Sequence, residues 1–420
     1  MTLLFTPAPA EADAARRPAP AAAPAQMPHR IADDAEAIAV ATQLAAQFAP
    51  EAALRDCERR LPWAELERFS ASGLCGITVP KAFGGAGVSV GALAEVIAII
   101  AAADGSLGQI PQNHFYALEV LRVGGTAAQQ RFFHDRALAG ERFGNALAEI
   151  GHKDFKRRTR ITPEGEGFRL DGKKFYCTGA LYAHWIPTLV VAQEAGREVT
   201  YIAFVPRNAP GVSIEDDWDG FGQRVTGSGS VTFEHVRVER EWVVPFLASF
   251  ESPTAIGPFA QILHAAIDLG IGRGALAATL PFVRDHARPW VDANVAQASD
   301  DPLTIHHVGD VAVRLRAAEA LLRRAGRMVD AAQRAPDERS VAAASVAVAA
   351  ARALTTTASL LAGSRLFELG GTASTLDGLG LDRFWRNART HTLHDPVRWK
   401  YHAVGNYYLN GKLPARHGAL

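Results

Sequence analysis

The chain has 420 residues, of which 48% are hydrophobic and 21% charged, and its 44 basic side chains balance 44 acidic ones. This length allows a large buried core, and the composition is ordinary for a globular protein. A net charge of zero argues against a surface dominated by nucleic-acid or anionic-membrane binding. We expect a cytoplasmic protein, because no secretory signal and no apolar run of about 18 residues is found.

The three cysteines, Cys57, Cys75 and Cys177, are widely spaced along the sequence. They form no Cys-x-x-Cys pair. Their number and spacing therefore exclude a disulfide framework and the usual structural zinc motifs.

Changes in composition divide the chain into four parts. Residues 1–28 are rich in Ala and Pro, which predicts a disordered leader. Residues 29–143 show helical periodicity, with an apolar helix expected over 88–103. Short apolar runs characterise residues 144–250, and residues 251–420 are helical again and end in a tail.

The third part predicts a small sheet. Apolar runs at 189–191 and 201–205 are typical of short strands. The pair Asp171-Gly172 lies between two further candidate strands and predicts a two-residue hairpin turn, because both residue types tolerate left-handed backbone. Strands at this spacing indicate an antiparallel sheet or barrel.

The last part predicts four long helices, over residues 255–288, 303–334, 337–369 and 381–409. Short loops between them favour antiparallel neighbours, as in a four-helix bundle. Pro281 falls inside the first helix and is expected to bend it. Helices, then strands, then helices indicate an α+β protein rather than alternating β-α units.

Several motifs resemble those of the acyl-CoA dehydrogenase superfamily. Residues 73–80 read Gly-Leu-Cys-Gly-Ile-Thr-Val-Pro, residues 222–228 read Gly-Gln-Arg-Val-Thr-Gly-Ser, and residues 386–389 read Arg-Asn-Ala-Arg. The resemblance covers nearly all of the chain after the leader. It implies an N-terminal helical domain, a central antiparallel β-barrel and a C-terminal four-helix bundle. It also implies a flavin between barrel and bundle, usually in a homotetramer.

The departures from the dehydrogenase pattern indicate a different chemistry. The Thr-Glu-Pro stretch of dehydrogenases is absent, and Arg288 is followed by Pro-Trp instead of the adenosine-binding motif of FAD enzymes. Where many dehydrogenases have a catalytic Glu, this chain has His394, Asp395 and Pro396. Asp is shorter than Glu and Pro restricts its backbone, which weakens the case for abstraction of an α-proton.

Residues 145–149, 176–179, 217–218 and 391–396 are instead similar to the reduced-flavin-dependent monooxygenase branch, the dibenzothiophene monooxygenase-like enzymes of sulfur acquisition. This resemblance implies FMNH2 supplied by a separate NAD(P)H-dependent flavin reductase. It implies that O2 reacts with FMNH2 to form a C4a-hydroperoxyflavin, and that this species oxygenates a small organosulfur or similar substrate.

The resemblance implies a catalytic set of five residues: His391, His394, Asp395, His114 and Thr178. A histidine near the flavin can hydrogen-bond a peroxide and prevent its loss as H2O2. By their spacing alone, His391 and His394 lie on one face of a helix. The same spacing is also typical of two ordinary polar residues at a helix end. A metal site completed by Asp395 is a further, weaker interpretation. A capping or core role fits His114 equally well.

The resemblance also implies that Asn145, Cys177, Thr178 and Trp218 line the flavin ring. An amide and a hydroxyl can satisfy the polar edge of the ring. Taken alone, Asn145 and Thr178 are typical turn or surface residues and Trp218 a core aromatic. Cys177 fits a small buried hydrophobe better than a nucleophile.

The resemblance implies three more residues that contact the cofactor. Arg288 would reach the FMN phosphate of a neighbouring subunit, and the bare backbone of Gly370 and Gly371 would approach the cofactor. By a plainer interpretation, Arg288 is a cation favoured at the C-terminal end of a helix, and the two glycines end a helix. The Gly-x-Gly-x-Gly run at 270–274 is not a dinucleotide motif, because no strand precedes it.

Two rival functions stay open. One is an FAD-dependent acyl-CoA dehydrogenase with Asp395 as its base. The other is a non-catalytic flavin- or ligand-binding member that acts in sulfur regulation. The tail after Asn406 would cross to a neighbouring subunit or form a frayed terminus.

Overall fold

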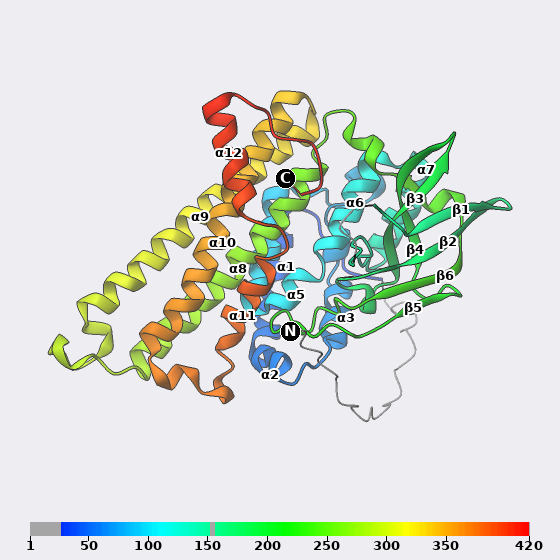
Figure 1. The fold of residues 1–420 in the computed structure, drawn as a ribbon. Helices are drawn as coiled ribbons and strands as arrows, with labels where there is room; N and C mark the ends of the chain where they lie inside the picture. Colours follow the sequence, from blue (N-terminus) through cyan, green and yellow to red (C-terminus); the bar gives the residue numbers. More distant parts are fainter. Residues whose placement is uncertain (1–26, 152–155, 420) are drawn as a thin grey trace, which may run out of the picture.

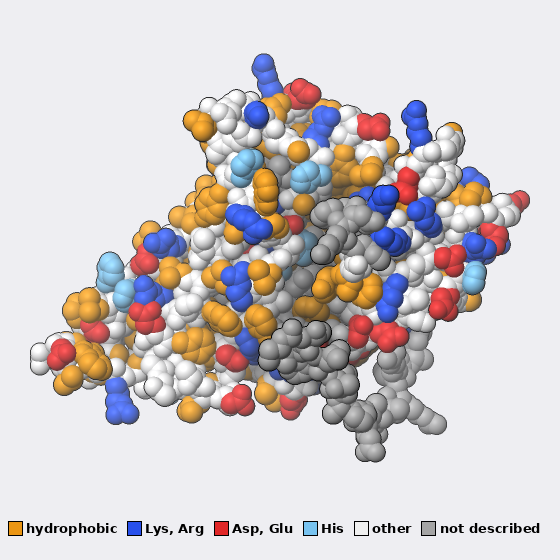
Figure 2. All heavy atoms as spheres, viewed as in Figure 1, with side chains coloured by type: hydrophobic (Ala, Val, Ile, Leu, Met, Phe, Trp, Pro, Cys, Tyr) orange, Lys and Arg blue, Asp and Glu red, His pale blue; other side chains and the backbone are white. Residues whose placement is uncertain are grey.

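The computed structural model describes residues 27–151 and 156–419. The predicted leader, residues 1–28, lies outside the described residues except for Met27 and Pro28. Helices, a sheet and longer helices follow one another along the chain, as expected for an α+β protein (Figure 1). Acidic and basic side chains are interspersed over the face shown in Figure 2, in keeping with the balanced charge.

The N-terminal part consists of α1 (Asp34–Phe48), α2 (Ala52–Cys57), α3 (Trp63–Ala71), α4 (Val90–Ala103), α5 (Gly105–Gln109), α6 (Gln112–Gly124) and α7 (Ala127–Leu138). The apolar helix predicted over 88–103 corresponds to α4. It begins at Ser89, whose hydroxyl accepts a hydrogen bond from the Ala92 N–H, and it ends at Asp104, whose carboxylate caps α5. Most of α4 is buried because apolar residues cover nearly all its faces.

The sheet consists of β1 (Arg160–Glu164), β2 (Gly167–Lys174), β3 (Trp185–Glu194), β4 (Arg197–Pro206), β5 (Val212–Ile214), β6 (Val231–Val238) and β7 (Val243–Pro245). These strands lie in the order β5-β6-β2-β1-β3-β4-β7. Neighbours are antiparallel except β1 and β3, which pair in parallel at Arg160 and Val191. This sheet occupies the place expected for the barrel.

The hairpin turn predicted at Asp171-Gly172 is wrong, because β2 runs through both residues. The register against β6 shifts between Leu170 and Gly172, so the glycine lies at a β-bulge. Its φ is +151°, and a Cβ there would lie 2.6 Å from Thr159. A bulge needs the same permissive backbone as a turn, and the sequence signal does not separate the two.

The C-terminal part consists of α8 (Ile256–Asp285), α9 (Pro302–Arg334), α10 (Glu338–Gly370), α11 (Asp382–His391) and α12 (Arg398–Asn410). The single helix predicted over 381–409 is wrong, because the chain leaves the helix between α11 and α12. Pro396 disfavours helical backbone at the residue before it and lacks a donor N–H. The break places His394 and Asp395 in a turn.

Helices α8 and α10 are long and apolar enough to cross a membrane by length and composition. In the structure, 61% of the apolar window of α8 and 78% of that of α10 are buried. Both helices contribute to the largest hydrophobic core, together with α4 and α9. Their apolar character is therefore explained by packing inside the protein.

Candidate active site

Helix α11 is fixed against the loop between β5 and β6. The Gln223 N–H donates to Asn387 Oδ1 at 2.7 Å, and Arg386 Nη1 donates to the Phe221 carbonyl at 2.8 Å. A Cβ at Gly222 would lie 2.1 Å from the Arg386 carbonyl oxygen, so only glycine fits this approach. The contact holds the end of α11, where His391 lies, against the sheet.

His391 is the centre of a buried polar network. Its Nδ1 lies 2.5 Å from Asp268 Oδ1, on α8. The other carboxylate oxygen accepts from Arg352 Nη1 at 2.6 Å and from Thr356 Oγ1 at 3.0 Å, both on α10. Burial alone would raise the pKa of Asp268, but Arg352 and His391 hold it below its usual range. Asp268 is therefore a carboxylate, stabilised by three donors.

A second histidine, His264 on α8, continues the network. Its Nδ1 lies 3.1 Å from His391 Nε2, and its ring lies 4.0 Å from the ring of His394, centroid to centroid. Burial, and then the charges of neighbouring groups, place the pKa of His264 well below its ordinary value. Burial also lowers the pKa of His391, although Asp268 opposes the shift. Both rings are therefore neutral at pH 7.

His394 and Asp395 form the outer part of the cluster. The His394 side chain is 43% exposed, and its Nδ1 lies 3.5 Å from Asp395 Oδ2. Burial would raise the pKa of Asp395, but His394, Lys400 and Arg352 hold it below its usual range. Burial lowers the pKa of Lys400 to about 8. The predicted pair His391 and His394 thus divides into a buried and a half-exposed ring.

The C-terminal tail, residues 411–419, returns to its own chain. It leaves α12 and runs back toward α8 (Figure 1). Gln261 Nε2 donates to the Gly418 carbonyl at 3.1 Å, and Lys400 Nζ donates to the Ala419 carbonyl. A Cβ at Gly418 would lie 3.3 Å from the hydroxyl of Tyr116 on α6. The tail therefore covers the region between α6, α8 and α12.

Tyr116 also lines a small hollow next to Asn145. The hollow is bounded by α6 and the sheet, with the lining residues Asn113, Tyr116, Ala117, Val120, Gly144, Asn145, Leu147, Pro187 and Ile202. Asn145 Oδ1 accepts from the Leu147 N–H at 3.0 Å, while its Nδ2 makes only a 3.5 Å contact with the Tyr176 carbonyl. The amide of Asn145 therefore retains donor capacity.

A continuous chain of hydrogen bonds connects two of the other predicted ring contacts, Thr178 and Trp218. Trp218 Nε1 and Thr226 Oγ1 each donate to the Gln223 carbonyl at 2.9 Å. Thr226 Oγ1 lies 2.7 Å from Ser228 Oγ, which lies 2.8 Å from Thr178 Oγ1. The fold thus brings together Thr178 and Trp218, which are far apart in sequence.

Two of the predicted residues have geometry that favours a structural role. His114 Nε2 lies 2.7 Å from the Cys75 carbonyl, and its Nδ1 accepts from the Phe143 N–H at 3.1 Å. Burial lowers the pKa of His114 to about 4, so the ring is neutral with both nitrogens engaged. Burial raises the pKa of Cys177 to about 12, which leaves a neutral thiol inside the sheet's core.

Arg288, Gly370 and Gly371 lie at the other end of the helical bundle. Gly370 is packed against Ser374 and against Phe282 near the end of α8. At a rise of about 1.5 Å per residue, α8 separates this end from His264 by about 30 Å. One chain therefore does not bring these three residues to the histidine cluster.

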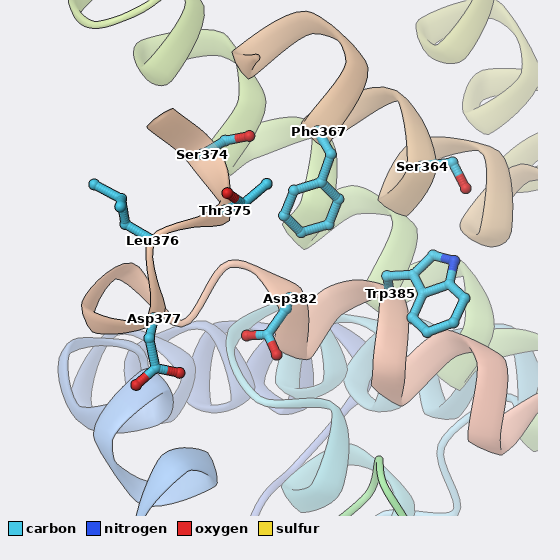
Figure 3. Close-up of a pocket in the computed structure, with 8 residues that line it drawn as sticks. All are labelled: Ser364, Phe367, Ser374, Thr375, Leu376, Asp377, Asp382 and Trp385. Atoms are coloured by element: carbon cyan, nitrogen blue, oxygen red, sulfur yellow. The ribbon is translucent and has the colours of Figure 1, made fainter. Parts of the chain in front are cut away.

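A hollow near that end has a volume of about 430 Å³. Figure 3 shows Ser364 and Phe367 projecting from α10, Asp382 and Trp385 from α11, and the lining residues Ser374, Thr375, Leu376 and Asp377 from the segment between the two helices. Two carboxylates line this hollow. Within residues 27–151 and 156–419, no group of three or more His, Cys, Asp or Glu side chains is arranged to hold a metal.

The sequence alone did not single out four residues of the cluster: His264, Asp268, Arg352 and Lys400. The available signal was weak. His264 and Asp268 are four residues apart in a largely apolar stretch of α8, so they lie on one face where a buried charge needs a partner. Their partners come from α10 and α11, which no local pattern connects to α8.

A flavin ring fits the residues between the sheet and α11. The ring is a flat apolar system whose pyrimidine edge both donates and accepts hydrogen bonds. In the described part of the chain, the side-chain amide of Gln223 and the hydroxyl of Thr390 are buried without a hydrogen-bond partner. Orphaned buried groups of this kind indicate a missing ligand. Together with Asn145 and Thr178, they supply both donors and acceptors.

Family models match the chain in the same order as its three parts. The N-terminal domain of acyl-CoA dehydrogenase matches residues 34–141, the middle domain residues 151–236 and the C-terminal domain residues 262–399. Fold and site therefore define an acyl-CoA dehydrogenase-like flavoprotein.

Known relatives narrow this class. The chain is 35% identical over 402 residues to dibenzothiophene monooxygenase from Rhodococcus erythropolis, which covers 92% of this chain and 96% of the relative. It is 34% identical over 385 residues to the probable FMNH2-dependent monooxygenase SfnC from Pseudomonas putida, covering 90% and 96%. The crystal structure of FMN-bound TdsC from Paenibacillus sp. A11-2 superposes with a TM-score of 0.87 at 32% identity, covering 91% of this chain and 100% of that chain. The chain belongs to the acyl-CoA dehydrogenase superfamily and, within it, to the reduced-flavin-dependent monooxygenase branch.

Proposed function

We propose that this protein is the oxygenase of a two-component flavin monooxygenase, which uses FMNH2 and O2 to oxygenate a small organosulfur compound in sulfur acquisition. The observation that carries this proposal is the similarity to such monooxygenases over more than nine-tenths of the chain. A histidine cluster at the break between α11 and α12, where dehydrogenases have a catalytic Glu, supports it.

FMNH2 supplies the two electrons that activate O2, and the protein supplies a dry, polar-edged site. Asn145, Thr178 and Gln223 would hold the pyrimidine edge of the ring. His391, held by Asp268, would provide an imidazole with a fixed orientation beside the site. No free energy is then needed to reorient the ring during the reaction. The C-terminal tail packs against α8 beside the cluster and would reduce the access of water, which would limit the loss of activated oxygen as H2O2.

The phosphate of FMN would be bound across a subunit boundary in a homotetramer. Arg288 is exposed and Gly371 presents open backbone, but both are remote from the ring site of their own chain. Large hydrophobic side chains on the helical bundle are also exposed, among them Trp290 at 70% and Leu303 at 69%. Exposed apolar surface of this kind supports a subunit interface.

We propose that a separate NAD(P)H-dependent flavin reductase supplies the reduced flavin in the cytoplasm. The Gly-rich run at 270–274 lies inside α8, where it allows close approach to neighbouring helices. A Cβ at Gly270 would lie 2.3 Å from the Ala98 carbonyl oxygen. These glycines therefore serve helix packing and do not form a dinucleotide site.

The rival function of an acyl-CoA dehydrogenase requires Asp395 to remove a proton from carbon. The surrounding positive groups hold the pKa of Asp395 low, which makes it a weak base. The second rival, a non-catalytic flavin-binding member, requires flavin binding without any effect on the reaction of FMNH2 with O2.

One experiment separates the three functions. Protein loaded anaerobically with FMNH2 is mixed with O2 while near-ultraviolet absorbance is followed. The proposed function predicts a spectrum that differs from both reduced and oxidised FMN and outlasts the reoxidation of free FMNH2. Reoxidation at the rate of free FMNH2, with and without dibenzothiophene, would contradict it. Tight FAD retention and bleaching by an acyl-CoA would support the dehydrogenase.

A further inference from the structure

The hydrogen bonds around His391 determine where its protons lie. Asp268 is a carboxylate that already accepts from Arg352 and Thr356, so His391 Nδ1 must carry the proton that bonds to Asp268 Oδ1. In the neutral ring, His391 Nε2 is then an acceptor. The facing nitrogen, His264 Nδ1 at 3.1 Å, must donate to it.

This arrangement leaves one nitrogen of the pair without a bonded partner. Among the residues that the structure describes, His264 bonds through Nδ1, and no hydrogen bond to its Nε2 is found. His264 as a residue is only 2% exposed, and its ring lies 4.0 Å from the ring of His394, centroid to centroid. Its Nε2 is not among the fully enclosed, unpartnered atoms of the described residues, so it is the atom of the pair that a proton from solvent can reach. Both rings are therefore held as the Nδ1–H form, which is the less common neutral form in water.

We propose that His264 and His391 form a two-imidazole proton relay whose positive charge rests on His391 beside Asp268. In this relay His264 is a positioning and proton-transferring residue; its use in oxygen transfer rests on the proposed function. The chain of contacts, Arg352 to Asp268 to His391 to His264, carries the argument.

The relay step is balanced within the protein. A proton arriving from solvent forms a bond at His264 Nε2, and the Nδ1–H bond of His264 breaks. The released proton forms a bond at His391 Nε2. His264 is neutral again, now as its Nε2–H form, and His391 is a cation next to the Asp268 carboxylate. No electrons are transferred, and the net result is one additional proton on the His391 ring.

The surroundings favour the charge on His391 over His264. Asp268 attracts a cation on His391, whereas the other positive groups near His264 repel one. Charged and titratable groups act on the pair from each neighbouring element: Asp268 from α8, Arg352 from α10, His394 from the turn after α11 and Lys400 from α12. Asp395 lies behind His394, and His417 of the tail lies near Lys400 and Asp395. A stored proton next to a fixed carboxylate is what an oxygen-transfer site needs when an oxygen atom leaves as water.

The relay is tested first on FMN-free protein, by two-bond proton–nitrogen NMR with 15N-labelled histidine. At pH 8 we expect both His391 and His264 as Nδ1–H. On acidification the two rings should titrate with one midpoint, and His264 should change from Nδ1–H to Nε2–H while His391 becomes the cation. Independent midpoints, or a cationic His264, would overturn the relay.

The variant His264→Asn places an amide donor near the position of Nδ1 but cannot pass a proton. It should keep His391 as Nδ1–H and remove the joint titration. In coupled assays with a flavin reductase, it should lower the product formed per O2 consumed about 10-fold or more. Normal coupling in this variant would overturn the relay's role. His134→Asn, at another buried histidine far from the cluster, is the control and should leave coupling unchanged.

The two arms also separate this inference from the proposed function. If wild-type protein forms no oxygenated product but shows the joint titration, the relay stands and the proposed function fails. If product forms and the rings titrate independently, the proposed function stands and the relay fails.

Discussion

Lowering the pH from 7.5 to 5.5 should destabilise the fold through neutral histidines that are wholly or largely buried. Burial lowers the pKa of each of His114, His134 and His184 from 6.5 to about 4. In the unfolded chain each is protonated near its ordinary pKa of about 6.5. Between these two values the unfolded state binds more protons than the folded state, so the free energy of unfolding decreases as the pH falls.

The size of the effect follows from those two pKa values. One such histidine contributes about 1.3 kcal/mol less to stability at pH 5.5 than at pH 7.5. Because His184 is partly exposed, we expect these three to contribute a loss of about 3 kcal/mol together rather than the full sum. His264 and His391, whose pKa values are also lowered by burial, add to this loss. The interval lies above the pH at which ordinary carboxyl groups of the unfolded chain take up protons. The histidines therefore dominate the change.

Urea unfolding at the two pH values, followed by tryptophan fluorescence and far-ultraviolet circular dichroism, measures this loss. The variant His134→Gln removes one titrating ring and should shrink the difference between pH 7.5 and 5.5 by about 1 kcal/mol. Equal free energies of unfolding at both pH values, or a more stable protein at pH 5.5, would refute the assignment of these histidines as buried and neutral.

Three substitutions test other parts of the structure. Arg352→Met leaves the Asp268 carboxylate buried without its cation and should cost about 3–5 kcal/mol in urea unfolding; a loss below 1 kcal/mol would contradict the buried ion pair. Gly222→Ala forces a Cβ against the Arg386 carbonyl and should weaken FMN binding and cost at least about 2 kcal/mol; unchanged binding and stability would contradict this close approach. Lys400→Met removes the contact to the C-terminal tail and should speed proteolysis of the tail several-fold, whereas an unchanged rate would show that the tail is held otherwise.

The parts of the fold that depend on local pattern were predictable from the sequence. Apolar periodicity gave α4 and the three long helices, because their buried faces are continuous along the chain. The Asp171-Gly172 pair was misinterpreted, since a bulge and a turn share one backbone requirement. The break before Pro396 was missed because the helical pattern on both sides is strong.

The candidate site was only partly predictable, for a physical reason. His391 and His394 were found through their motif. The partners of His391 are Asp268 and His264, separated from it by 123 and 127 residues along the chain. Only the packing of α8 against α10 and α11 brings them together, and no local spacing contains that information. The two backbone hydrogen bonds of His114, which favour a structural role, are invisible in sequence.

The most direct test of the central claim is the fate of labelled oxygen. The protein, FMN, NADH and a flavin reductase are incubated with dibenzothiophene under 18O2, and the products are examined by mass spectrometry. The proposed function predicts one 18O atom per oxygenation of the sulfur compound, in a reaction that requires this protein. NADH consumption with all oxygen recovered as H2O2, and no label in the sulfur compound or in a methanesulfinate control reaction, would contradict it.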